Sequence, residues 1–202
     1  MKRDIQKQLR VIIEELEEGP GDTDVYTSFF INNFDEIVSF YMLFTKYGPF
    51  QLFEDISSRK EKILETACAY MMMEAKPRIV RFKLLAIVTG YREQNLINAA
   101  LRFIRTYKGE EYREGAYLIE VYSPAIKVQD NFIKPMQEAW LNITHPRGKI
   151  RDRVVAFIGA FLKSSGVKTT QAALEEATGV SRSTLSPKIK QYENILKKYF
   201  NQ

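Results

Sequence analysis

Residues 169–186, "TTQAALEEATGVSRSTLS", contain a short helical segment, a glycine turn and the beginning of a second helix. Thr169 or Thr170 is a suitable N-cap, and the three alanines that follow favour a helix as far as the glycine. Gly179 supplies the positive φ that a sharp turn requires. Since Ser181 can cap the next segment, the stretch predicts two helices joined by a tight turn.

The flanking sequence adds a third helix in front of this pair. The segment "KIRDRVVAFIGAFLKSSG" (149–166) has valine, phenylalanine, isoleucine and leucine on one helical side and ends in glycine. In the stretch itself, Leu174 lies five residues before Gly179, Val180 directly after it, and Leu185 six after it. These three apolar positions are expected to pack together and fix the angle between the helices.

This pattern resembles the helix-turn-helix superfamily of DNA-binding domains over residues 149–193. A small polar run opens the expected recognition helix, as is usual in that superfamily. Two positions depart from the pattern. Glu175 stands where a small residue is usual, and Pro187 falls inside the expected recognition helix, which could instead restart with Ser186 as its cap.

The resemblance implies a role for each polar residue. Arg182 is the expected base reader, because a guanidinium can bind both acceptors of guanine. Hydrogen bonds to bases or phosphates are expected from the opening of the recognition helix, namely Ser181, Ser183, Thr184 and Ser186. Phosphate anchoring is expected from the start of the preceding helix, namely Thr169, Thr170 and Gln171. The electrostatic attraction is assigned to Arg147, Lys149, Lys168, Lys188 and Lys190.

Positive charge is concentrated in the same part of the chain. From His145 onward there are eleven lysines and arginines against four acidic residues, a net charge of +7, whereas residues 1–144 carry −2. This asymmetry indicates a polyanionic partner. If about four basic side chains neutralise phosphates, the logarithm of the binding constant should fall with the logarithm of salt concentration at a slope of about −3 to −4.

Other chemistries have little support in the sequence. Cys68 is the single cysteine, so a disulfide within the chain is ruled out. His145 is the single histidine and lies in a Pro-Gly loop, so a Ser-His-Asp triad is not expected. The longest apolar run (154–162) is shorter than the roughly 20 residues that span a bilayer. We therefore expect a cytoplasmic protein of a prokaryote, plasmid or virus, with no enzymatic activity, no cofactor, no metal and no membrane partner.

The middle of the chain contains a weaker copy of the same turn. In "LLAIVTGYREQNLINAALRFIRTYKG" (84–109), Thr89-Gly90 parallels Thr178-Gly179 about 90 residues later, with leucines at the same offsets. Residues 116–122 are rich in aromatic and β-branched types and predict a strand, followed by a Ser-Pro turn. Helices followed by a hairpin predict a winged helix. The secondary nucleic-acid candidates on it are Arg92, Gln94, Asn98, Arg102 and Arg105.

The expected fold is therefore mostly α, with tandem helix-turn-helix or winged-helix units and a small β-hairpin wing in the first. We expect an N-terminal helical segment over 1–55, a winged-helix-like domain over 56–128, a connecting helix and linker over 129–146, and a basic helix-turn-helix domain over 147–202. The connecting helix should begin near Pro135.

This organisation favours a protein that binds specific double-stranded DNA as a homodimer, either a transcriptional regulator or an initiator of replication or partition. The tandem layout is similar to that of plasmid replication initiators. The alternative is a structural, mainly protein-binding subunit, as in the tandem winged-helix subunits of bacterial condensin. A third possibility is a ligand-sensing regulator whose N-terminal aromatic residues line a pocket. Dimerisation could use a heptad-like stripe over 185–199, or that stripe could pack on its own domain.

Overall fold

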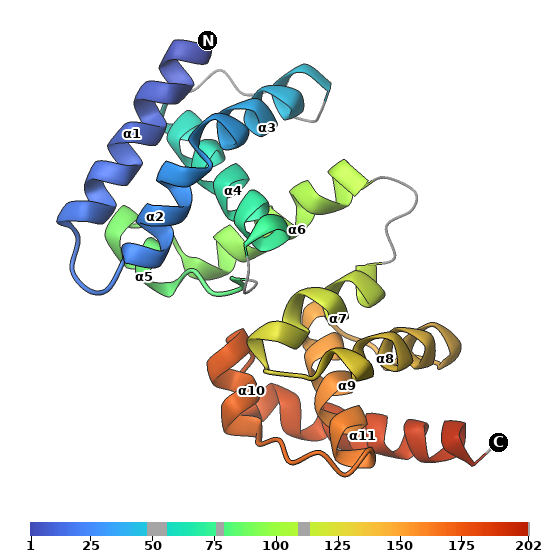
Figure 1. Ribbon diagram of the computed structural model, residues 1–202. Helices are drawn as coiled ribbons and strands as arrows, with labels where there is room; N and C mark the ends of the chain where they lie inside the picture. The colour runs from blue at the N-terminus through green and yellow to red at the C-terminus, as the bar shows by residue number, and fades with distance from the viewer. Residues whose placement is uncertain (48–55, 76–78, 109–113, 202) are drawn as a thin grey trace. The chain divides into compact units, whose positions relative to one another are not determined.

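The computed structural model describes residues 1–47, 56–75, 79–108 and 114–201 (Figure 1). Within these ranges the chain forms eleven helices and no strand, which confirms the mostly α class. No helix in the described ranges is both long and apolar enough to cross a bilayer. The chain divides into two compact units, Met1–Gly109 and Glu110–Gln202.

The first unit is built around the contact between its fourth and sixth helices. Its helices are α1 (Lys2–Glu18), α2 (Asp24–Asn32), α3 (Phe34–Tyr47), α4 (Ile56–Glu74), α5 (Lys83–Thr89) and α6 (Glu93–Lys108). α1 packs on the four helices that follow it, and its apolar side from Ile5 to Leu16 is buried as its spacing predicts. The aromatic residues of α2 and α3 pack against α4, where Phe29 and Phe40 both contact Tyr70.

The helix expected over residues 28–44 is two helices that meet at Asn33. The backbone N–H and the side-chain amide of Asn33 both donate to the carbonyl oxygen of Phe29, at 3.0 and 2.8 Å. Asparagine side chains compete with the helical hydrogen-bond ladder in this way and favour helix ends. The break therefore follows from a single side chain within an otherwise apolar, helical run.

The second unit contains α7 (Glu114–Ala125), α8 (Asp130–Asn142), α9 (Ile150–Ser164), α10 (Gln171–Thr178) and α11 (Arg182–Phe200). α9 is its centre and contacts all four other helices. Nine consecutive residues of α9, from Val154 to Leu162, are buried. A helix that is apolar on every side is typical of such a central position.

The strand and wing predicted for residues 116–128 are wrong, because α7 covers residues 114–125. α7 is buried at Gly115–Ile119 and again at Val121–Ser123, so most of its circumference meets other side chains and only Glu120 between them is exposed. A short run that is apolar throughout has no periodicity that separates a buried helix from a buried strand. Ser123 completes the helical pattern by donating to the carbonyl of Ile119 at 2.6 Å.

The units also divide the chain at a different place from the one expected. The predicted boundary after residue 146 lies inside the second unit, and the expected connector 129–146 contains α8, which packs on α7 and α9. α8 begins at Asp130 and includes Pro135 in its interior rather than its first turn. The other expected boundary, after residue 55, lies outside the described residues.

This division changes the charge of each part. The first unit has 16 basic and 15 acidic residues, and the second has 14 and 10, so both carry a net positive charge. The excess positive charge of the sequence is therefore not confined to the second unit.

The heptad-like stripe of the C-terminal helix packs within its own unit. Leu185, Ile189, Tyr192 and Leu196 are all buried, and α11 forms its main contact with α9. Of the two possibilities for this stripe, the structure shows packing on its own domain. A homodimer would therefore need a different surface.

Replacing Gly115 with alanine should destabilise the second unit. The added Cβ would lie 1.9 Å from Nε1 of Trp140, in the interior of the α7–α8 contact. We expect a loss of about 3 kcal/mol in the free energy of unfolding, because packed cores have no room to accommodate such a clash. Trp140 is the single tryptophan of the chain, so its fluorescence during urea unfolding reports on this unit.

The matched control is Gly166→Ala. Gly166 has a φ of +75° but no neighbouring atom within 4 Å of an added Cβ. Only backbone strain of about 1–2 kcal/mol is expected there. Equal losses for the two variants would show that the contact with Trp140 is not a steric constraint.

Candidate nucleic-acid interface

The candidate interface stands on the contact between α9, α10 and α11. Gly159 on α9 leaves space for Leu174 of α10, since a Cβ at this position would lie 2.7 Å from Leu174 Cδ1. Leu174 and Leu185 are completely buried, and Val180 is 2% exposed. The three apolar positions around the glycine turn therefore form one core, as predicted.

The turn itself has the predicted left-handed glycine. Gly179 has φ 73° and ψ 9°, and its N–H donates to the carbonyl of Glu175 at 2.7 Å. Thr178 stabilises the same corner, because its hydroxyl donates to Leu174 O at 2.7 Å and accepts from Val180 N at 3.3 Å. The sequence shows this threonine but gives no sign of its two buried bonds.

The N-terminus of α10 is capped as expected. The hydroxyl of Thr170 accepts a hydrogen bond from Ala173 N at 3.1 Å, which identifies Thr170 rather than Thr169 as the N-cap. Lys168 and Thr170 are exposed, and Thr169 and Gln171 are partly exposed. This end of the helix is open to solvent and carries the positive end of the helix dipole.

α11 is one continuous helix from Arg182 to Phe200, so the alternative start at Ser186 is wrong. Pro187 lies within it on the exposed side and removes the hydrogen bond to the carbonyl of Ser183. The hydroxyl of Ser181 lies 3.0 Å from those of Ser183 and Thr184. The first turn of α11 therefore presents a cluster of three hydroxyl groups.

Glu175, the unusual residue of the pattern, is bonded to the beginning of α11. One carboxylate oxygen lies 2.8 Å from Arg182 Nε, and the other accepts from Arg182 N at 3.3 Å. Arg182 is 65% exposed and Glu175 37%. The N-terminus of α11 is the positive end of its dipole, which favours the carboxylate of Glu175 and disfavours the guanidinium of Arg182. The sequence could have predicted this pair, because Glu175 and Arg182 carry opposite charges and are seven residues apart across a tight turn.

Four of the predicted residues line one groove between the beginning of α10 and the middle of α11. They are Thr169, Gln171, Ser186 and Lys190. Gly159, Leu174 and Ile189 also line the groove, as do the charged residues Lys163 and Glu193. Lys163 and Glu193 form an ion pair at 2.8 Å. The groove therefore brings hydroxyl, amide and ammonium groups of two helices together.

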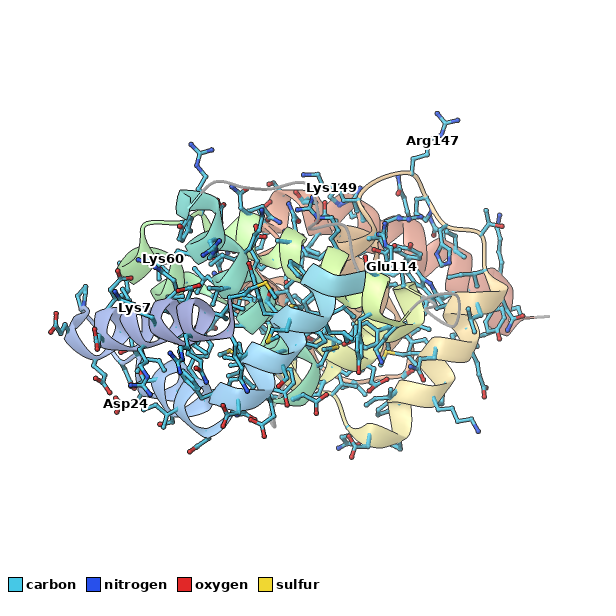
Figure 2. The ribbon with its side chains drawn as sticks, turned by 90° about the horizontal axis from the view of Figure 1, so that it is seen from above. Lys7, Asp24, Lys60, Glu114, Arg147 and Lys149 are labelled. Carbon is cyan, nitrogen blue, oxygen red and sulfur yellow. The ribbon has the colours of Figure 1, made fainter. Side chains whose placement is uncertain are left out.

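Lys188 lies on a different side of α11, against the loop that precedes α9. A Cβ added to Gly148 would lie 3.0 Å from Lys188 Nζ. Arg147 and Lys149 flank this glycine and are exposed, and Figure 2 shows Arg147 extending away from the ribbon. Eleven of the thirteen predicted residues thus form three groups: the groove, the first turn of α11, and this basic loop with Lys188. The other two, Lys168 and Thr170, lie directly before α10.

His145 fixes the basic loop to the helices beneath it. Its Nε2 donates to the carbonyl of Trp140 at 2.9 Å, so Nδ1 accepts from the Tyr192 hydroxyl at 3.2 Å. The imidazole also stacks on Trp140, with 3.7 Å between ring centroids. Burial lowers the pKa of His145 below its usual value near 6.5, although the bond to Trp140 opposes the shift. The sequence placed this residue only in a loop.

The secondary candidates lie in the first unit, apart from these groups. Arg92, Gln94, Asn98, Arg102 and Arg105 are all exposed, the last four on α6 and Arg92 directly before it. Gln94 Nε2 donates to Asn98 Oδ1 at 2.7 Å.

Comparison with known proteins assigns no family to this arrangement. No protein-family model, no curated protein sequence and no solved structure matches the chain.

The second unit should lose stability as the pH falls below about 6.5. The unfolded chain has the higher histidine pKa, so it binds a proton before the folded chain does and acid favours unfolding. The fluorescence of Trp140 during urea unfolding, measured at about pH 7.5 and 5.5, gives the change in unfolding free energy. The variant His145→Gln should show a smaller change, and equal changes in both proteins would contradict the prediction.

Proposed function

We propose that this protein binds specific sites on double-stranded DNA through α10 and α11, as a transcriptional regulator or an initiator of replication or partition. The observation that carries the proposal is the groove in which Gln171 of α10 and Thr169, two residues before it, face Ser186 and Lys190 of α11. A helix-turn-helix needs this combination, because one helix contacts the phosphates while the next reaches the bases.

The exposed side of α11 suits the major groove. Ser183, Ser186 and Lys190 recur at three- and four-residue spacing and therefore lie along one side of the helix. Their side chains are small or flexible, so the helix backbone can approach the bases closely. The three hydroxyl groups of the first turn can bond to base edges or to phosphates.

Arg182 is the proposed reader of guanine. Its Nε is directed to Glu175, which leaves the two terminal nitrogens of the guanidinium for O6 and N7 of the base. An arginine held by a carboxylate loses less conformational freedom on binding than an arginine that moves freely. Glu175 thus supports base recognition even though it carries the same charge sign as DNA.

Two regions supply phosphate contacts. The first is the open N-terminus of α10, which offers backbone amides and the positive end of its dipole. The second is the basic loop with Arg147 and Lys149, against which Lys188 of α11 lies. Because such contacts do not depend on sequence, they would set the position of α11 on the duplex.

A structural, mainly protein-binding role is the alternative, and one observation favours it. α2 exposes Val25 and Ile31, at 58% and 52% of their surface. Exposed apolar side chains take part in a protein contact where they gather into one patch. The same surface could serve the proposed homodimer, since the stripe of α11 is buried within its own unit.

The double variant Arg182→Ala/Lys190→Ala should bind a selected duplex about 10- to 100-fold more weakly, because it loses a bidentate base contact and an ammonium group. Fluorescence anisotropy with a labelled duplex measures the effect. The control Lys197→Ala/Lys198→Ala removes the same charge from the exposed last turn of α11 and should bind as the unaltered protein does. Equal weakening in both variants would show that binding depends on net charge and not on this site.

Selection of bound sites from random duplexes, at two salt concentrations, tests the function as a whole. Enrichment of a defined sequence supports specific binding, and an enriched palindrome supports a symmetric dimer. Salt-sensitive binding without enrichment would indicate an architectural role. Failure to bind any duplex would leave the protein-binding alternative.

A further inference from the structure

The first unit contains a second helix-turn-helix corner. α5 ends at Gly90 with φ 76°, compared with 73° for Gly179 after α10, and in each case three residues separate the two helices. Leu85 and Leu96 are buried, as are their counterparts in the second unit. The repeat seen in the sequence therefore corresponds to one local geometry formed twice.

The exposed face of α6 carries polar side chains suited to base edges. Gln94, Asn98, Arg102 and Arg105 recur at spacings of four, four and three residues, so they share one side of the helix, and all four are exposed. The opposite side is apolar and buried from Leu96 to Ile104. Amide side chains pair with adenine and guanidinium groups with guanine.

Positive charge predominates in the segment that carries this face, and Glu65 of the adjacent α4 lies near Arg102. Residues 79–108 contain six basic residues and one acidic residue, a net charge of +5 within a unit whose total is +1. The one acidic residue is Glu93, whose carboxylate lies 2.6 Å from Arg81 Nε and accepts from Phe82 N at 3.0 Å. Glu93 thereby ties the beginning of α6 to the beginning of α5, and its charge is compensated by Arg81.

We propose that the exposed face of α6, with Arg92 before it and Lys83 at the beginning of α5, is a second duplex-DNA-binding surface. Lys83 is exposed and occupies the position that anchors phosphate in a helix-turn-helix. The protein would then contact two segments of DNA, one through each unit. This surface requires no residue of α10 or α11.

The shape and chemistry of the face select duplex DNA over other nucleic acids. An α-helix fits the wide major groove of B-form DNA, whereas the major groove of duplex RNA is too deep and narrow for it. Single strands are usually bound by aromatic rings on which bases stack. The face defined by Gln94, Asn98, Arg102 and Arg105 has amide and guanidinium groups instead.

The hydrogen bond between Gln94 and Asn98 prepares the face for recognition. Because Gln94 Nε2 donates to Asn98 Oδ1, the oxygen of Gln94 and the amide nitrogen of Asn98 keep their capacity for a ligand. Together they offer an acceptor and donors in a fixed arrangement. This is the pattern that the N6 amino group and N7 of adenine require.

The test compares variants of the full chain in duplex binding at several salt concentrations. Arg92→Gln/Asn98→Ala/Arg102→Gln alters the α6 face, and Lys2→Gln/Arg3→Gln removes equal charge from exposed positions of α1. Each is made alone and together with Arg182→Ala/Lys190→Ala. The single substitution Asn98→Asp adds a negative charge to an exposed position and guards against misfolding of the triple variant; circular dichroism checks all folds.

The α6 variant should weaken duplex binding in both backgrounds and reduce the magnitude of the salt slope by about 2, because two positive charges that displace counterions from the duplex are lost. Asn98→Asp should weaken binding as well, and the α1 control should not. Binding equal to that of the control in both backgrounds would overturn the proposal. Equally tight binding to a duplex RNA of the same sequence would also overturn it.

The outcomes separate this proposal from the function assigned to the second unit. Loss of binding only in the α6 variants would support this surface and remove the site on α11. Loss only in the Arg182→Ala/Lys190→Ala variant would do the reverse. Absence of duplex binding by the unaltered protein would overturn both.

Discussion

The approach of Leu174 to the bare backbone of Gly159 is the constraint on which the second unit depends. Without a side chain at this point, α10 can lie directly on α9, and its position then determines where the turn at Gly179 starts α11. The polar residues of α10 and of the beginning of α11 are placed by this contact, although none takes part in it. A single missing methyl group thus controls the geometry of a surface that is otherwise made of exposed side chains.

The two helix corners at Gly90 and Gly179 use opposite arrangements of charge. α6 begins with Glu93, which suits the positive end of the helix and binds back to Arg81. α11 begins with Arg182, and Glu175 in the preceding helix compensates for it. The first arrangement buries its charges partly and fixes the corner, whereas the second leaves a cation exposed at the tip of the helix. The same helix corner therefore occurs with a partly buried ion pair at Gly90 and with an exposed arginine at Gly179.

The sequence predicted what depends on local periodicity and single special residues. The apolar side of α1 and the left-handed Gly179 are examples, because each is determined within a few neighbouring positions. It failed at α7, where burial around most of the helix removes the period that distinguishes helix from strand. Long-range pairings such as that of His145 with Tyr192 depend on tertiary packing and leave no local pattern. The charge of each unit was misjudged because residues 110–144, which contain α7 and α8 and carry a net charge of −3, belong to the second unit.

The division of labour along α11 has a consequence for how binding preferences can change. Leu185 and Ile189 secure the helix to its unit, while Ser183, Ser186 and Lys190 face outward and contribute little to that packing. Substitutions at the outward positions are therefore expected to alter recognition with small effects on folding, typically within about 0.5 kcal/mol. Such a helix is open to gradual evolutionary retargeting, and to laboratory engineering, without redesign of the protein beneath it.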